Sequence, residues 1–188
     1  MGEVRHLAAA ELEAGLDHIR QAPQDRGALE LIVRRPADGE REVLAEAELR
    51  LDVGLVGDNW LARGSKRTDD GSAHPEKQLN IMGARAAALV ATARERWPLA
   101  GDQLYLDLDL STTNLPPGTQ FELGSAVIEV TALPHRGCKK FVSRFGADAM
   151  AFVNSPLGCD LNLRGINAKV VQPGVVRVGD VVRKLHGN

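Results

Sequence analysis

Residues 103–131, QLYLDLDLSTTNLPPGTQFELGSAVIEVT, decide the fold class of this chain. At their start, Leu104, Leu106 and Leu108 alternate with their neighbours, and this period of two predicts a half-buried strand. Residues 115–119, LPPGT, have the composition of a rigid turn. Aromatic and β-branched residues then continue to position 131, so the stretch predicts strands on both sides of the turn.

Segments with the same alternating or β-branched pattern lie on either side of this stretch. They predict further strands at residues 29–34, 41–49, 168–171, 175–178 and 181–185. We expect the first two to pair through a turn at residues 36–39, and the third and fourth to form a hairpin over Pro173 and Gly174. Many short strands at this spacing predict a mostly β, barrel-like fold with peripheral α-helices.

Two segments have a helical pattern instead. Residues 7–19 place Leu12, Leu16 and Ile19 on one face, as an amphipathic helix would. Residues 84–97 are rich in Ala and Arg, and a proline follows them, so we expect a helix that stops there. These helices would decorate the barrel.

The 188 residues suffice for one well-buried core. The 44% apolar and 26% charged residues fit an ordinary globular protein, so we expect a single domain, with a helical segment at 1–28 and a core at 29–185. We see no secretory signal, and no apolar run near the ~20 residues that cross a bilayer, so no membrane partner is expected. Two cysteines make no disulfide framework, which favours a cytoplasmic location.

The net charge of −2 conceals an asymmetry along the chain. Residues 1–135 hold 14 Lys and Arg against 22 Asp and Glu, whereas residues 136–188 hold 9 against 3. The basic part has no long Lys/Arg block and few aromatic residues, so no nucleic-acid partner is predicted. A pocket for a small anion is one explanation, because a few cations suffice for one phosphate. A bland surface on which both parts mix is the other.

Residues 134–146, PHRGCKKFVSRFG, carry the most informative chemistry. They open a predicted helix with an apolar face at Phe141, Phe145, Ala149 and Phe152. Cys138 would lie at the N-terminus of that helix, where free N–H groups and the dipole stabilise a thiolate. Four nearby cations act in the same direction: Arg136, Lys139, Lys140 and Arg144. We therefore expect a reactive Cys138, suited to carrying sulfur or binding molybdenum.

Each cysteine has a plainer alternative. Cys138 could be a small buried residue, as many free cysteines are. Cys159 lacks a cationic neighbourhood in the sequence, and we expect it in a loop at residues 156–159 with a structural role. The chain has no CxxC or HExxH pattern, so the spacing supports neither a redox pair nor a zinc site.

The cysteine stretch resembles the cysteine motif of MOSC domains, the family named after the C-terminal domain of molybdenum-cofactor sulfurase. Other stretches resemble the rest of that family's pattern, in order: GLVGD at 54–58, HPEKQL at 74–79, LPPGT at 115–119, NLRGINA at 162–168 and GVVRVGD at 174–180. A single Gly-Asp pair would mean nothing, but the ordered set with the cysteine is specific. The resemblance covers about residues 29–185.

The resemblance implies a barrel-like fold and a role with the molybdenum cofactor, a molybdopterin. In the family, the cysteine is proposed to carry sulfane sulfur or to ligate molybdenum, which implies both roles for Cys138. Some relatives are thought to reduce N-hydroxylated compounds; the alternative here is a non-catalytic cofactor-binding or storage module. The chain has no room for the pyridoxal-phosphate domain of larger relatives, so pyridoxal phosphate is not expected. Electrons or sulfur would come from a partner protein, such as a cysteine desulfurase.

Several polar residues are candidates for holding this cofactor. We expect Arg164 and Asn167, with Arg136, Lys139 and Arg144, to grip the phosphate and the pterin. Guanidinium groups match phosphate oxygens, and an Asn side chain offers a donor and an acceptor to a pterin edge. The alternative for Arg164 is a surface cation or a β-bulge residue.

A second group of candidates lies on or near the polar loop at residues 64–75. Asp58 is either a turn residue, as Asp102 and Asp180 are expected to be, or a partner that orients Arg63 or Lys66. His74 and Lys77 either bind an anion and shuttle protons, or are merely exposed. His135 could act as a base beside Cys138, although a solvated histidine is the default expectation.

Overall fold

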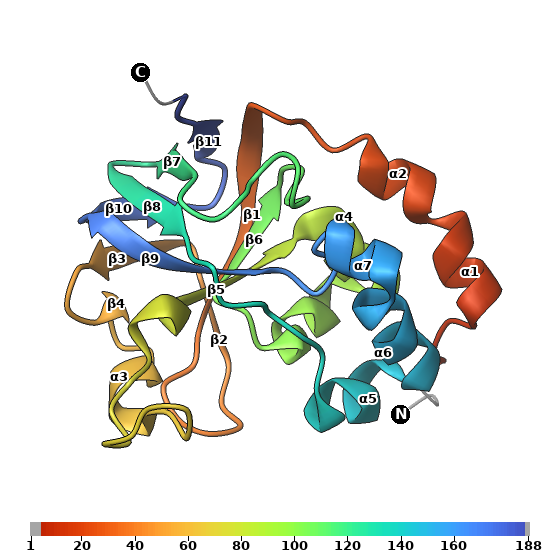
Figure 1. The fold of residues 1–188 in the computed structure, drawn as a ribbon, viewed down its shortest axis with the longest axis horizontal. Coiled ribbons are helices and arrows are strands. Elements are labelled where there is room, and N and C mark those ends of the chain that lie inside the picture. The colour runs from red at the N-terminus through yellow and green to blue at the C-terminus, as the bar shows by residue number, and fades with distance from the viewer. Residues whose placement is uncertain (1–4, 187–188) are drawn as a thin grey trace.

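A closed barrel of seven strands forms the centre of the computed structural model, which describes residues 5–186 (Figure 1). The barrel strands are β1 (Arg26–Arg34), β5 (Leu79–Gly83), β6 (Leu104–Asp107), β7 (Gln120–Leu123), β8 (Ala126–Val130), β9 (Ile166–Gln172) and β11 (Val181–Lys184). Their order is β11-β7-β8-β9-β5-β6-β1, and β1 closes the barrel on β11. In the part of the chain that the structure describes, β5 and β6 are the one parallel pair of strands. The predicted barrel with peripheral helices is confirmed.

Among residues 5–186, four further strands lie outside the barrel. β2 (Glu42–Leu44) extends the sheet beyond β1, whereas β10 (Gly174–Arg177), β3 (Glu46–Arg50) and β4 (Gly54–Leu55) form a separate small sheet. The predicted pairing of β1 with the following segment is correct, but the predicted hairpin after β9 is wrong. β9 pairs with β8 and β5, and β10 pairs with β3, because the chain changes sheets at Pro173 and Gly174. Gly174 permits this, since a Cβ there would lie 2.4 Å from the Ser125 backbone.

Two apolar clusters hold the molecule together. Leu29, Leu104, Phe121 and Ile128 belong to the cluster inside the barrel. The second cluster lies between the barrel wall and the helices, and Tyr105 belongs to it. β6 is therefore buried on both faces, not half-buried as its alternation predicted, because helices cover its outer face.

The helices are shorter than the sequence pattern predicted. α4 (Ala84–Ala91) ends at Thr92, whose φ of +62° breaks the helix, and the 3-10 helix η2 (Arg94–Ala100) follows with Pro98 inside it. The helix predicted after Cys138 divides at Gly146 into α5 (Lys139–Phe145) and α6 (Ala147–Asn154), and Val153 is buried where Phe152 was expected. Residues 156–159, predicted as a loop, lie in α7 (Pro156–Asp160). Within residues 5–186, no helix has the length and apolarity to span a membrane.

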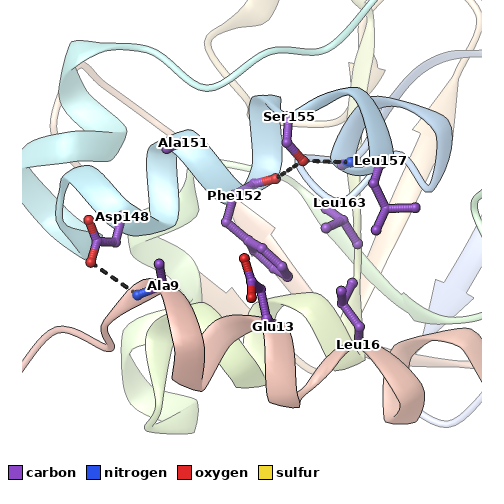
Figure 2. Close-up of a pocket in the computed structure, with 10 residues that line it drawn as sticks. Ala9, Glu13, Leu16, Asp148, Ala151, Phe152, Ser155, Leu157 and Leu163 are labelled. Atoms are coloured by element: carbon purple, nitrogen blue, oxygen red, sulfur yellow. Dashed lines mark hydrogen bonds between the residues drawn. The ribbon is translucent and has the colours of Figure 1, made fainter.

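The N-terminal segment packs on other helices and adds Leu12 to the cluster between them and the barrel wall. The predicted helix divides at Gly15 into α1 (Ala9–Ala14) and α2 (Leu16–Arg20), which pack on α6 and α4. Figure 2 shows the groove of about 380 Å³ that remains between these helices and α6–α7, lined by Leu16, Phe152 and Leu163. None of the predicted site residues lines this groove.

Two short elements that the sequence analysis missed border the polar loop. α3 (Trp60–Arg63) precedes the loop, and the 3-10 helix η1 (Pro75–Lys77) follows it and leads into β5. Figure 1 shows α3 at the edge of the molecule, beyond the small sheet. The loop is thus held at both ends, which fixes the side chains that it carries.

Candidate functional site

A pocket of about 270 Å³ lies between α3, the polar loop and η1. Four cations line this cation pocket: Arg63, Lys66, Arg67 and Lys77. Trp60 and His74 complete its wall. The structure therefore brings together four residues that the sequence analysis had singled out, and adds Arg67 and Trp60, which it missed.

The cation pocket is short of negative charge. Within residues 5–186, no side-chain nitrogen of its four cations has a hydrogen-bond or ion-pair partner, and no acidic residue lines it. Burial lowers the pKa of Lys77, and Arg67 and Arg63 lower it further. Burial, followed by Arg35, lowers the pKa of Arg63, although Asp58 and Asp38 act in the opposite direction. Burial and neighbouring positive charges thus disfavour the protonated forms of these side chains. A bound anion would stabilise the protonated forms.

His74 and Trp60 shape the pocket through the backbone. The Trp60 indole N–H donates to the His74 carbonyl oxygen (3.3 Å), and His74 Nδ1 accepts from the Glu76 N–H (3.2 Å) at the start of η1. This second bond caps η1 and orients the imidazole. His74 therefore has a structural role in the wall, whatever it contributes to binding.

Asp58 lies behind the cation pocket, paired with an arginine that the sequence analysis missed. Its carboxylate accepts from Arg35 Nε (2.8 Å) and Nη2 (2.8 Å), and both side chains are almost wholly buried. It also accepts from the Trp60 backbone N–H (3.0 Å), which ties it to α3. Asp58 thus orients Arg35 and α3, not Arg63 or Lys66 as one hypothesis had it.

A buried polar chain runs from Arg35 through the neighbouring strands β5 and β9. Arg35 Nη1 donates to Asn80 Oδ1 (3.0 Å), and Asn80 Nδ2 donates to Asn167 Oδ1 (2.7 Å). Asn167 Nδ2 then donates to the Leu133 carbonyl oxygen (2.8 Å). Protein groups already engage both ends of the Asn167 amide, so this residue connects the Asp58 side of the site to the loop that carries the cysteine.

Arg164 and Asp102 form a second buried pair. Arg164 Nη1 donates to Asp102 Oδ2 (2.7 Å), and Nη2 donates to the Ala100 carbonyl oxygen (2.9 Å). Arg164 is therefore not a surface cation, and its buried Nε has no hydrogen-bond partner among residues 5–186. Asp102 is wholly buried, so the expectation of a turn residue is wrong. Burial raises its pKa, but Arg164 and then His135 outweigh burial and lower the pKa to about 2.

His135 is bonded to the same carboxylate rather than solvated. Its Nε2 lies 2.9 Å from Asp102 Oδ1, and its side chain is 16% exposed. Burial, followed by Arg164, lowers the pKa of His135 despite Asp102. His135 lines a cavity of about 140 Å³, called here the small cavity, whose other polar walls include Arg136, Cys159 and Asn167.

Cys138 lies outside the small cavity. It is exposed and precedes α5, as predicted, and the neighbouring Lys140 donates to Asp38 (3.2 Å). Lys139 is exposed beside it. Asp38 is also close enough to Arg63 for that cation to help lower its pKa, although Lys140 is the main cause. Lys140 at the start of α5 and Arg63 of the cation pocket therefore both lie near Asp38, in the segment between β1 and β2.

The two remaining predicted cations point elsewhere. Arg144 Nη1 donates to the Leu99 carbonyl oxygen (2.6 Å), which ties α5 to η2. Arg136 donates to Cys159 Sγ, so Cys159 does have a cationic neighbour. Sequence distance concealed this contact, since 23 residues separate the two. Among residues 5–186, no three His, Cys, Asp or Glu side chains are placed to hold a metal ion.

The fold defines the class: a closed seven-stranded barrel with peripheral helices. The family model of the MOSC domain matches residues 69–183, and the chain belongs to the MOSC domain family, which is associated with the molybdenum cofactor. Among curated proteins, no sequence matches this chain.

Solved structures share the fold at low sequence identity. The YuaD protein from Bacillus subtilis is 18% identical, with a TM-score of 0.60 over 84% of this chain and 94% of that chain. YiiM from Escherichia coli is 19% identical, with a TM-score of 0.55 over 86% of this chain and 71% of that chain. At these identities the likeness extends to the fold alone.

Proposed function

We propose that this protein binds a molybdopterin-type cofactor, with its phosphate in the cation pocket and Cys138 as the working thiol. The observation that carries the proposal is the cation pocket itself, where four cations converge and no group of residues 5–186 pairs with their charged nitrogens. Guanidinium forks match phosphate oxygens, and the lysines add point charges. A volume of about 270 Å³ accommodates one phosphate with its linking atoms, so the residues fit this part of the cofactor.

Each group of residues has a distinct task in this proposal. Arg63, Lys66, Arg67 and Lys77 bind the phosphate. The buried pair of Asp58 and Arg35 fixes α3 and so the position of Arg63. Bound molybdenum would supply two-electron redox chemistry, and the Cys138 thiolate is a soft ligand for it or a carrier of sulfane sulfur.

The exposure of Cys138 supports exchange with a partner protein. A cysteine desulfurase could deliver sulfur to an exposed thiol, and an electron-donor protein could approach the same surface. With such a donor, reduction of N-hydroxylated compounds is the candidate activity. Both cysteines are free, which suits a reducing compartment such as the cytoplasm.

The alternative is a cofactor-binding or storage module without turnover. The hydrogen bonding of Asn167 and Arg164 favours it in one respect. Protein groups engage both ends of the Asn167 amide and, on Arg164, both Nη atoms but not Nε, so these side chains keep few atoms for a reacting substrate. A storage module would need the cation pocket but no chemistry at Cys138.

The deciding experiment compares three versions of the full chain from a host that makes the molybdenum cofactor: wild type, Cys138→Ser and Lys77→Gln. Elemental analysis reports molybdenum, and intact mass reports an added sulfur atom. We expect Lys77→Gln to retain less cofactor, and Cys138→Ser to lose the added sulfur or the molybdenum. If Cys138→Ser retains cofactor fully and the wild type carries no added sulfur, the storage module is correct. If no version binds molybdenum or pterin, the proposal is wrong.

A further inference from the structure

The Asp102 carboxylate determines which nitrogen of His135 carries the proton. With its pKa lowered to about 2, Asp102 is ionised at neutral pH and can only accept hydrogen bonds. The proton between Asp102 Oδ1 and His135 Nε2 must therefore belong to Nε2. A neutral imidazole carries a single proton, so Nδ1 is left with a free lone pair.

The free nitrogen lies on the side of the ring away from Asp102. Within residues 5–186, His135 Nδ1 has no hydrogen-bond partner and is not among the buried atoms that lack one, so it reaches solvent. The imidazole itself lines the small cavity. A cavity of about 140 Å³ is close to the volume that holds a benzene-sized molecule.

We propose that His135 Nδ1 is the proton acceptor of the small cavity, and that Asp102 and Arg164 are positioning residues that keep this nitrogen unprotonated. The ligand class is a small molecule, or the end of a larger one, that presents an N–H or O–H group. On transfer, the proton leaves the ligand atom and binds Nδ1, the ligand keeps the bonding electron pair, and Nε2–H stays on Asp102. The carboxylate then stabilises the imidazolium that forms.

This proposal rests on the proposed function only for the identity of the ligand, which would be a part of the cofactor or its substrate bound in the small cavity. The protonation of His135 itself requires no bound ligand. The charged groups around the ring are Asp102, Arg164 and Lys77, with Arg136 next to it in the sequence. Burial and then Arg164 disfavour the imidazolium, as does Lys77, and together they outweigh Asp102. The pKa of His135 is therefore lowered, and the ring is neutral at neutral pH.

The test is ¹⁵N NMR of the imidazole rings in the full chain without cofactor. The five histidines are separated by recording His135→Gln beside the wild type; Gln can still donate to Asp102, so the fold is expected to persist. We expect wild-type His135 to show protonated Nε2 and unprotonated Nδ1. Phenol, a ring of suitable size with an O–H group, should shift the Nδ1 resonance, and benzene should not.

Asp102→Asn is the decisive variant, because Arg164 can only donate hydrogen bonds. The single Asn oxygen must serve Arg164, so the Asn NH₂ faces His135 Nε2 and forces the proton onto Nδ1. We expect inverted protonation of the ring and loss of the phenol shift. Wild-type His135 with protonated Nδ1, or an unchanged ring in Asp102→Asn, would overturn the proposal. If Asp102→Asn does not fold, the protonation of wild-type His135 and its response to phenol still test the proposal.

These outcomes are independent of molybdenum. If His135 has the expected protonation but the protein never retains cofactor, the proton-acceptor proposal stands and the proposed function is wrong. If the protein retains cofactor through the cation pocket but His135 Nδ1 is protonated, the proposed function stands and the proton-acceptor proposal is wrong.

Discussion

Two regions of this protein place arginine side chains in opposite electrostatic settings. Inside the barrel wall, Arg35 and Arg164 are buried, and each donates to a fully buried carboxylate. In the cation pocket, Arg63 and Arg67 lie beside two lysines without a carboxylate partner within residues 5–186. In each buried pair the arginine is neutralised by a carboxylate of the protein. In the cation pocket the positive charge is available to a bound anion.

This difference separates scaffold from binding surface. A buried ion pair contributes little beyond a well-packed apolar pair, but removing one partner leaves a charge in the interior. Unpaired cations close together repel one another, so their presence costs stability and indicates a gain on binding. Truncation should therefore harm folding in the first region and anion binding in the second.

The largest expected effect is Asp58→Ala. The change leaves Arg35 buried without its partner and removes the acceptor of the Trp60 N–H, so we expect a loss of about 3–5 kcal/mol in the free energy of unfolding. Urea unfolding measures it. The matched control is Asp52→Ala, which removes an exposed partner of Arg50 and should cost about 0–1 kcal/mol. Similar losses for both variants would contradict the comparison.

Acid should remove the contribution of the second buried pair. The Asp102 pKa is lowered from 3.8 to about 2, so its stabilisation is fully present above pH 3.8 and is lost as the pH falls through 2. The loss amounts to about 2 kcal/mol. His135 acts in the same direction: its lowered pKa means that stability begins to fall once the pH drops below 6.5.

Urea unfolding between pH 7 and pH 2 measures both contributions. His135→Gln should remove the decrease that begins below pH 6.5 and keep the one below pH 3.8. A His135→Gln profile that matches the wild type would show that this histidine does not titrate as we infer.

In the cation pocket, Lys77→Gln should leave stability unchanged or raise it by a few tenths of a kcal/mol. The variant relieves repulsion from Arg67 and Arg63 and removes a partly buried charge. Affinity for inorganic phosphate should fall about tenfold, the effect of one lost charge-assisted hydrogen bond. Phosphate-dependent thermal shifts measure both quantities. Lys169→Gln, which removes an exposed partner of Glu129, is the control and should leave phosphate affinity unchanged.

The two regions also differ in how far the sequence could predict them. Strand alternation predicted the barrel. The sequence also singled out Arg63, Lys66, His74 and Lys77, which are near one another along the chain, but it did not predict that they line one pocket. The buried pairs were missed because their partners are far apart: 23 residues separate Arg35 from Asp58, and 62 separate Asp102 from Arg164. A Gly-Asp pair looks like a turn locally, and Asp102 is buried only because the fold brings Arg164 and His135 against it.

Cys138→Ser should also have little effect on stability, because the thiol is exposed. We expect a change within about 0.5 kcal/mol. The same exposure should make Cys138 the first thiol that iodoacetamide modifies in the native chain, with the half-buried Cys159 reacting later. Mass spectrometry of peptides over time measures the order. Earlier modification of Cys159 would move the reactive thiol from the surface to the small cavity, where Arg136 contacts its sulfur.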